Sequence, residues 1–275
     1  MKRLAIAVVH GLGSEEEFYS VELKHRITEE YVNGGEGRLE DDLLFFEIYW
    51  ADLVKEELKT FRSKANYKED LAYPNIRKIM TDAQAIALLY RPGTEVYESI
   101  NNRIKDGMRK FASHRRVLQD ETPLVVLAHS YGAVMMTHYI KEMQSVDSER
   151  SNFETMKTLA GFITFGSPQG IYSLGSLNSE LGQSCKITGT ALPADLAKRS
   201  RWYNFYDKDD VVAYPLKGLS DDFAANVDGD FEINVGSAAT SWNPACHTGY
   251  WEDKDFYKPV AEFIGELRAP HSFWD

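Results

Sequence analysis

Apolar residues occur along the chain in short runs that are rich in β-branched and aromatic side chains and end at turn-forming residues, a pattern typical of buried strands. Stretches with helix-compatible spacing lie between most of these runs. The expected strands are residues 4–9, 43–50, 123–129, 159–166, 201–206 and 231–236. The expected helices are residues 15–32, 52–69, 75–90, 94–117, 132–146 and 252–268. Because parallel strands need long crossover connections, this alternation predicts an α/β fold with a mostly parallel sheet of six or more strands and helices on both faces.

The length of 275 residues and the 43% hydrophobic content are enough for one sizeable core, so we expect residues 1–275 to form a single domain. A helical segment at 52–120 precedes the strand at 123–129. Its first part, residues 52–95, has two interpretations. It is either an ordinary helical layer on the sheet, which we favour, or a partial cap over the site.

The charge balance argues against nucleic acid as a partner. Lysine and arginine number 31 against 42 acidic residues, a formal net charge of −11, and no basic stripe is present.

No apolar run approaches the roughly 18 residues of a membrane span, so we expect no integral membrane segment. The first apolar run is short and lacks a cleavage site, and only two cysteines are present. These features predict a cytoplasmic protein, while its oligomeric state stays open.

The strand at 123–129 runs into the segment AHSYG, residues 128–132, and then into an apolar helix. A sharp strand-to-helix turn with small residues on either side of a serine is a nucleophile elbow, which exposes the serine hydroxyl above the sheet. Ala128 and Gly132 are small because neighbouring backbone passes close by. The pentapeptide alone is a weak signal, but its position between strand and helix predicts Ser130 as a nucleophile.

A nucleophilic serine needs a base and an orienting carboxylate, and both follow it in the sequence. Asp207, Asp209 and Asp210 lie just past the strand at 201–206, on the rim where parallel sheets bind ligands. All three qualify by position. His247 lies in a loop before the last helix and is the predicted base. The competing histidines lie in helical stretches (His25, His114, His138), in the tail (His271) or before the serine (His10, His129).

The first strand runs into the segment HGLG, residues 10–13. Gly11 and Gly13 let the chain turn tightly and bring a backbone N–H, that of Leu12, toward the site. Together with the N–H of Tyr131, the residue after the serine, it would form a two-donor oxyanion hole.

The segments HGLG, AHSYG, FITFGSPQG, FYDKDDVV and ACHTGYW together resemble the α/β-hydrolase superfamily, on its lipase and esterase side. The resemblance implies Ser130 as nucleophile, His247 as base, oxyanion amides from Leu12 and Tyr131, and no cofactor. It also selects Asp209 as the acid, because D-D-V-V-A is similar to the Asp-x-x-Val-Pro turn common in this superfamily. Ala128 departs from the family by replacing the usual first glycine of the elbow.

The expected activity is therefore that of a serine hydrolase that cleaves a small-molecule or lipid carboxylic ester through an acyl-enzyme. Two alternatives remain: an acyltransferase with the same triad, and a non-catalytic binding or scaffold protein on the same fold. No H-E-x-x-H or C-x-x-C motif supports a metal site. Cys246 beside His247 is more simply explained by packing than by redox regulation.

Overall fold

The computed structural model describes residues 3–12, 17–64, 74–146, 149–174 and 183–268. Within them lies a six-stranded sheet in the order β2-β1-β3-β4-β5-β6, in which every strand pair is parallel. The α/β fold predicted from the sequence is confirmed. The strands are β1 (Leu4–Val9), β2 (Leu43–Ile48), β3 (Leu124–His129), β4 (Leu159–Phe165), β5 (Arg201–Asp207) and β6 (Gly229–Ile233).

Six helices correspond to the predicted ones, with shifted ends: α1 (Val21–Asn33), α2 (Lys55–Lys64), α3 (Pro74–Leu89), α4 (Glu95–Ala112), α5 (Tyr131–Ser145) and α9 (Lys254–Arg268). Parts of the predicted helices at 15–32 and 52–69 lie outside the described residues. Three further helices are only six residues long, too short for a helical periodicity to show in the sequence: α6 (Gln169–Leu174), α7 (Ala194–Arg199) and α8 (Asp221–Asn226). In the described part of the chain, the 3₁₀ helices are η1 (Glu40–Asp42), η2 (Ala51–Val54) and η4 (Pro244–Trp251).

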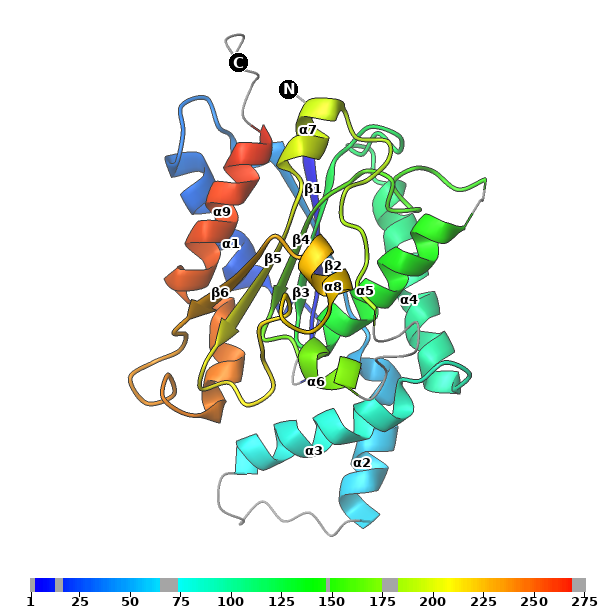
Figure 1. The fold of residues 1–275 in the computed structure, drawn as a ribbon, viewed down its shortest axis with the longest axis vertical. Helices are drawn as coiled ribbons and strands as arrows, with labels where there is room; N and C mark the ends of the chain where they lie inside the picture. Colours follow the sequence, from blue (N-terminus) through cyan, green and yellow to red (C-terminus); the bar gives the residue numbers. More distant parts are fainter. Residues whose placement is uncertain (1–2, 13–16, 65–73, 147–148, 175–182, 269–275) are drawn as a thin grey trace.

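Helices cover both faces of the sheet because successive strand residues point to opposite sides. On one face, Ile6 and Val8 pack with residues of α1 and α9, among them Ile27 and Ile264. On the other face, side chains such as Val126 pack with α4 and α5. Figure 1 shows α1 and α9 side by side on one side of the sheet and α4 and α5 on the other.

The helical segment before β3 divides into two parts. Helix α4 belongs to a sheet-covering layer, since a Cβ placed on Gly107 would lie 3.1 Å from the side chain of Ile48. Helices α2 and α3 instead extend beyond the carboxyl ends of the strands, at the bottom of Figure 1. The hydroxyl of Tyr131 donates to the carbonyl of Ala83 on α3 at 2.9 Å, which joins α3 to the start of α5.

Among the described residues, no helix combines the length and apolar character that crossing a membrane requires.

Candidate active site

Ser130 connects β3 to α5 in a strained backbone conformation. Its φ of 52° and ψ of −128° lie in a region that non-glycine residues rarely occupy, at a cost of about 1–3 kcal/mol. Two backbone hydrogen bonds hold this conformation: the N–H of Ser130 donates to the carbonyl of Phe165 at 2.9 Å, and the N–H of Ala133 donates to the carbonyl of Ser130 at 2.9 Å. The strand-to-helix turn therefore has the geometry expected of a nucleophile elbow.

Two glycines around Ser130 are required by close packing. A Cβ on Gly11 would lie 2.3 Å from the Cβ of Ser130 and 2.9 Å from its Oγ. A Cβ on Gly132 would lie 2.5 Å from the carbonyl oxygen of His10. The segment after β1 thus passes directly against the serine turn, and only glycine permits so short a separation.

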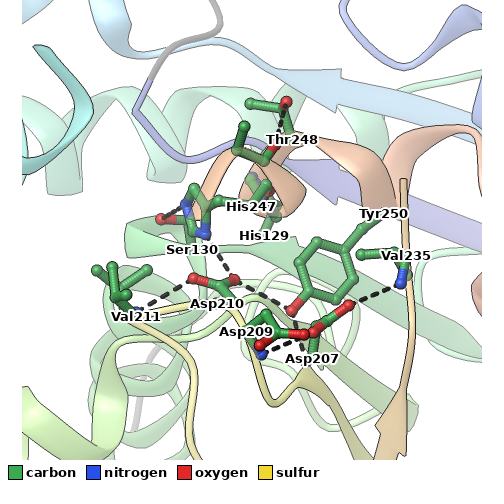
Figure 2. A network of polar contacts seen from close by, with 12 residues as sticks. His129, Ser130, Asp207, Asp209, Asp210, Val211, Val235, His247, Thr248 and Tyr250 are labelled. Carbon is green, nitrogen blue, oxygen red and sulfur yellow. Dashed lines mark hydrogen bonds and ion pairs between the residues drawn. The ribbon is translucent and has the colours of Figure 1, made fainter. Parts of the chain in front are cut away.

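The structure brings His247 and Ser130 together, although 117 positions separate them in the sequence. His247 lies in η4, with its Nε2 3.0 Å from Ser130 Oγ and its Nδ1 2.8 Å from Asp210 Oδ2 (Figure 2). Because the carboxylate can only accept, Nδ1 carries the imidazole proton and Nε2 is left to accept from the serine hydroxyl. All three side chains are at most 3% exposed, so water screens these contacts little.

Asp209, which the resemblance selects as the acid, does not contact the imidazole; its neighbour Asp210 does. Strand β5 continues to Asp207, one residue further than predicted, and a tight turn follows in which the N–H of Asp210 donates to the carbonyl of Asp207. Asp209 occupies the outer part of this turn and donates its N–H to Asp207 Oδ1 at 2.8 Å. The fourth residue of the turn, Asp210, is directed back toward His247, as Figure 2 shows.

Tyr250 provides a second hydrogen bond to the carboxylate of Asp210. Its hydroxyl donates to Asp210 Oδ2 at 3.1 Å and accepts from the N–H of Asp207 at 2.8 Å (Figure 2). Burial and the nearby negative charge of Asp210 raise the pKa of the Tyr250 hydroxyl well above its usual value, so this group stays protonated and keeps donating. No motif in the sequence marks Tyr250 as part of the site, although it lies only three residues after His247.

Asp207 fastens the turn to the segment that carries His247. Its Oδ2 accepts from the N–H of Val235, just after β6, at 2.7 Å. Asp207 is fully buried, and its other oxygen accepts from the N–H of Asp209. This carboxylate therefore orients the two chain segments that bear Asp210 and His247.

His129 contacts both the backbone and the ring of His247. Its Nε2–H donates to the carbonyl oxygen of His247 at 3.0 Å, and the two ring centroids are 4.9 Å apart. Burial, and next the proximity of His247, hold the pKa of His129 well below its usual value, so this ring is neutral. His129 is thus excluded as the base by its contacts as well as by its position in the sequence.

Leu12 and Tyr131, the predicted oxyanion donors, lie in the two segments that flank Ser130. Tyr131 is the first residue of α5, where backbone N–H groups have no partner within the helix. Leu12 follows Gly11, which packs on the serine, and is 5% exposed. Gly13, the second glycine of the predicted turn, lies outside the described residues.

His10 fixes the segment that leads to Leu12. Its Nδ1–H donates to the carbonyl of Gly11 at 2.6 Å, and its Nε2 accepts from the N–H of Trp50 at 3.0 Å. The indole Nε1–H of Trp50 in turn donates to the carbonyl of His10 at 2.8 Å, and the rings stack at 5.0 Å. Burial lowers the pKa of His10 to about 4, so both ring nitrogens keep these roles at neutral pH.

A cavity of about 620 Å³ lies between α3 and residues that are close in the sequence to Ser130 and Asp210. Its wall includes Tyr131, directly after the serine, and Val212, whose N–H donates to Asp210 Oδ1 at 3.1 Å. The site therefore combines a buried Ser-His-Asp arrangement with an adjacent, mostly apolar space.

Within the described part of the chain, no group of three or more histidine, cysteine, aspartate or glutamate side chains is arranged to hold a metal ion. No protein-family model matches the chain, and a search of the curated proteins finds no match either.

Proposed function

We propose that the protein is a serine hydrolase of the α/β-hydrolase superfamily that cleaves carboxylic esters. One observation carries this proposal: the continuous hydrogen-bonded series from Ser130 Oγ through the imidazole of His247 to Asp210, built on a strained turn at the carboxyl end of a parallel strand. Such a series converts a weakly nucleophilic hydroxyl into an effective one. A merely structural serine would have no need of a positive φ at this position.

The mechanism follows from the assigned protons. His247 Nε2 takes the proton of Ser130 as its Oγ attacks the ester carbonyl, while the carboxylate of Asp210 holds the Nδ1–H tautomer and stabilises the imidazolium. The backbone N–H groups of Leu12 and Tyr131 are the proposed donors to the oxyanion of the tetrahedral intermediate. His247 then gives its proton to the leaving alcohol, and an acyl-enzyme on Ser130 remains. Water resolves the acyl-enzyme by the same sequence of proton transfers.

The surroundings favour a small-molecule or lipid ester as the substrate, because the cavity beside Tyr131 is mostly apolar. The described cysteines, Cys185 and Cys246, are free and buried, which agrees with a reducing, cytoplasmic location.

The test combines covalent labelling with turnover. Wild type should react with a fluorophosphonate probe and hydrolyse 4-nitrophenyl acetate, whereas Ser130→Ala should do neither. Ser145→Ala, which changes an exposed serine at the end of the same helix, serves as the matched control and should behave like wild type. A folded wild type that neither labels nor cleaves any ester would contradict the proposal and favour a scaffold role.

Product analysis in the presence of butanol separates hydrolysis from acyl transfer. A hydrolase releases mainly the free acid, whereas an acyltransferase yields mainly the butyl ester from the same acyl-enzyme.

A further inference from the structure

The cavity that Tyr131, the residue after Ser130, helps to line is large enough for a whole acyl chain. Its volume of about 620 Å³ lies within the roughly 300–1,000 Å³ of small-molecule sites. It is bounded by α3 on one side and by the starts of α5 and α6 on the other. The lining side chains are mostly apolar or aromatic: Met80, Ala83, Ala87, Pro92, Tyr131, Pro168, Ile171, Tyr172 and Val212, with Gln84 and Arg91.

Two tyrosine hydroxyls hold this cavity open. Tyr131 donates to the carbonyl of Ala83 at 2.9 Å, and Tyr172 donates to the carbonyl of Tyr90 at 2.9 Å, just past the end of α3. Burial raises the pKa of Tyr172 to about 12 and moves that of Tyr131 upward as well, so both groups remain donors. Helix α3 is thereby fixed to the elements behind it, and the space exists before a ligand binds.

The lining selects against charge. Among the described residues of the wall, Arg91 alone is charged, and it is exposed, with its Nε–H donating to the carbonyl of Ala87 at 3.3 Å. A charged group placed against the apolar part of this wall would lose its water without meeting an opposite charge among the described lining residues, which is unfavourable. An uncharged hydrocarbon chain gains free energy from the same burial.

The cavity lies on the acyl side of the ester. The leaving alcohol must receive its proton from His247 Nε2, so it has to lie against the loop Pro244–Trp251. No residue of that loop lines the cavity, whereas Tyr131, the neighbour of the nucleophile, does. The chain attached to the carbonyl carbon is therefore the part directed into this space.

Resting on the hydrolase function proposed above, we infer that the substrate carries a medium or long unbranched apolar acyl chain, and that Ala83 and Ala87 set the space available to it. These two alanines are four residues apart and so share one face of α3, where larger side chains would narrow the cavity. A second apolar hollow of about 500 Å³ adjoins the cavity at Ile171 and gives longer chains a further surface.

The experiment measures kcat/KM for 4-nitrophenyl esters from acetate to decanoate with wild type and Ala87→Leu. In wild type, each added methylene should raise kcat/KM about fourfold until the cavity is filled. Leucine at position 87 removes the volume of roughly two or more methylenes, so kcat/KM for octanoate should fall at least about tenfold more than for acetate. The matched control is Ala85→Leu, the same substitution on the same helix at a position outside the cavity wall, which should keep the wild-type chain-length profile.

The inference is overturned if wild type prefers acetate over all longer acyl chains, or if Ala87→Leu lowers every acyl ester by the same factor. It is also overturned if Ala87→Leu changes the profile for alkyl acetates of increasing alcohol length and leaves the acyl profile as in wild type.

A binding experiment tests the cavity assignment independently of the proposed hydrolase activity. The affinity of methyl octanoate is measured by calorimetry with Ser130→Ala, which lacks the nucleophile and cannot cleave the ester. Binding to Ser130→Ala that weakens at least tenfold in Ser130→Ala/Ala87→Leu supports the cavity assignment even if wild type proves inactive on esters. Absence of binding to Ser130→Ala, or equal binding to both variants, refutes it.

Discussion

The hydroxyl of Tyr250 and the imidazole of His247 share one oxygen atom of Asp210. Oδ2 of this carboxylate accepts from the Nδ1–H of His247 at 2.8 Å and from the O–H of Tyr250 at 3.1 Å. The second donor shares the negative charge of this oxygen and holds the carboxylate in its orientation toward His247. Tyr250 is therefore a positioning residue that acts on the base through Asp210.

Tyr250→Phe should lower kcat about tenfold and leave KM unchanged, because Asp210 loses a side-chain donor and holds the imidazole of His247 less firmly. The measurement is the steady-state kinetics of ester hydrolysis. Tyr206→Phe is the control, since the hydroxyl of Tyr206 contacts the exposed Glu232 on β6 and its loss should leave kcat as in wild type. An unchanged kcat in Tyr250→Phe, or an equal loss in both variants, would contradict the positioning role.

Asp210→Asn should lower kcat on the order of 10⁴-fold, because an asparagine amide stabilises the wrong imidazole tautomer and no imidazolium. Asp209→Asn should stay within about threefold of wild type, since the Asp209 side chain does not contact His247. Steady-state kinetics of both variants distinguishes the two neighbours directly. Equal losses in the two variants would contradict the assignment.

Gly11→Ala should remove most of the activity and lower the stability by about 1–3 kcal/mol. The new methyl group would overlap the Cβ of Ser130 at 2.3 Å, so either the serine or the segment of Leu12 has to shift. Gly218→Ala is the control, because a Cβ there meets nothing within 4 Å. Thermal unfolding and kcat of the two variants check this; a fully active Gly11→Ala would mean that the contact is not needed.

The protein should lose stability as the pH falls from about 6.5 to about 4. The pKa of His10 is about 4 in the folded protein, because burial disfavours its charge, against about 6.5 in the unfolded chain. Between these values the unfolded state binds more protons, so acid favours unfolding, by at most about 3 kcal/mol for this group. The pKa of His129 is lowered in the same direction.

The free energy of unfolding, measured with urea between pH 4 and 6.5, should therefore depend less steeply on pH in His10→Gln than in wild type. His25→Gln, which alters an exposed histidine on α1, should keep the wild-type slope. A wild-type slope in His10→Gln would show that His10 is not the titrating group.

The thiol of Cys246 should be unreactive despite lying beside His247. Burial, and then the negative charges of Asp210, Asp207 and Asp209, raise its pKa to about 12, so almost no thiolate exists at pH 8. Iodoacetamide at pH 8 should leave the folded protein unmodified and active, and should alkylate both cysteines only after unfolding. Rapid loss of activity on alkylation of Cys246 in the folded protein would contradict this prediction and would favour a redox role for Cys246.

The sequence by itself determined the elements that local pattern specifies. The six strands and six long helices were predictable, because a buried strand is a short apolar run and a helix of several turns repeats its apolar positions often enough to be detected. Ser130 was predictable for a similar reason: the strand, the small-residue turn and the helix around it are contiguous. The helices α6, α7 and α8 were missed because six residues hold less than two turns.

The tertiary structure decided everything that depends on contacts between distant segments. The choice of Asp210 over Asp209 depends on the orientation of a four-residue turn and on where η4 lies beside it, and neither is local. The roles of Tyr250 and of His129 likewise consist of hydrogen bonds formed only when loops from separate strands meet. The place of α3 beside Tyr131 is of the same kind, since an amphipathic helix shows from its sequence that it covers something, but not what it covers.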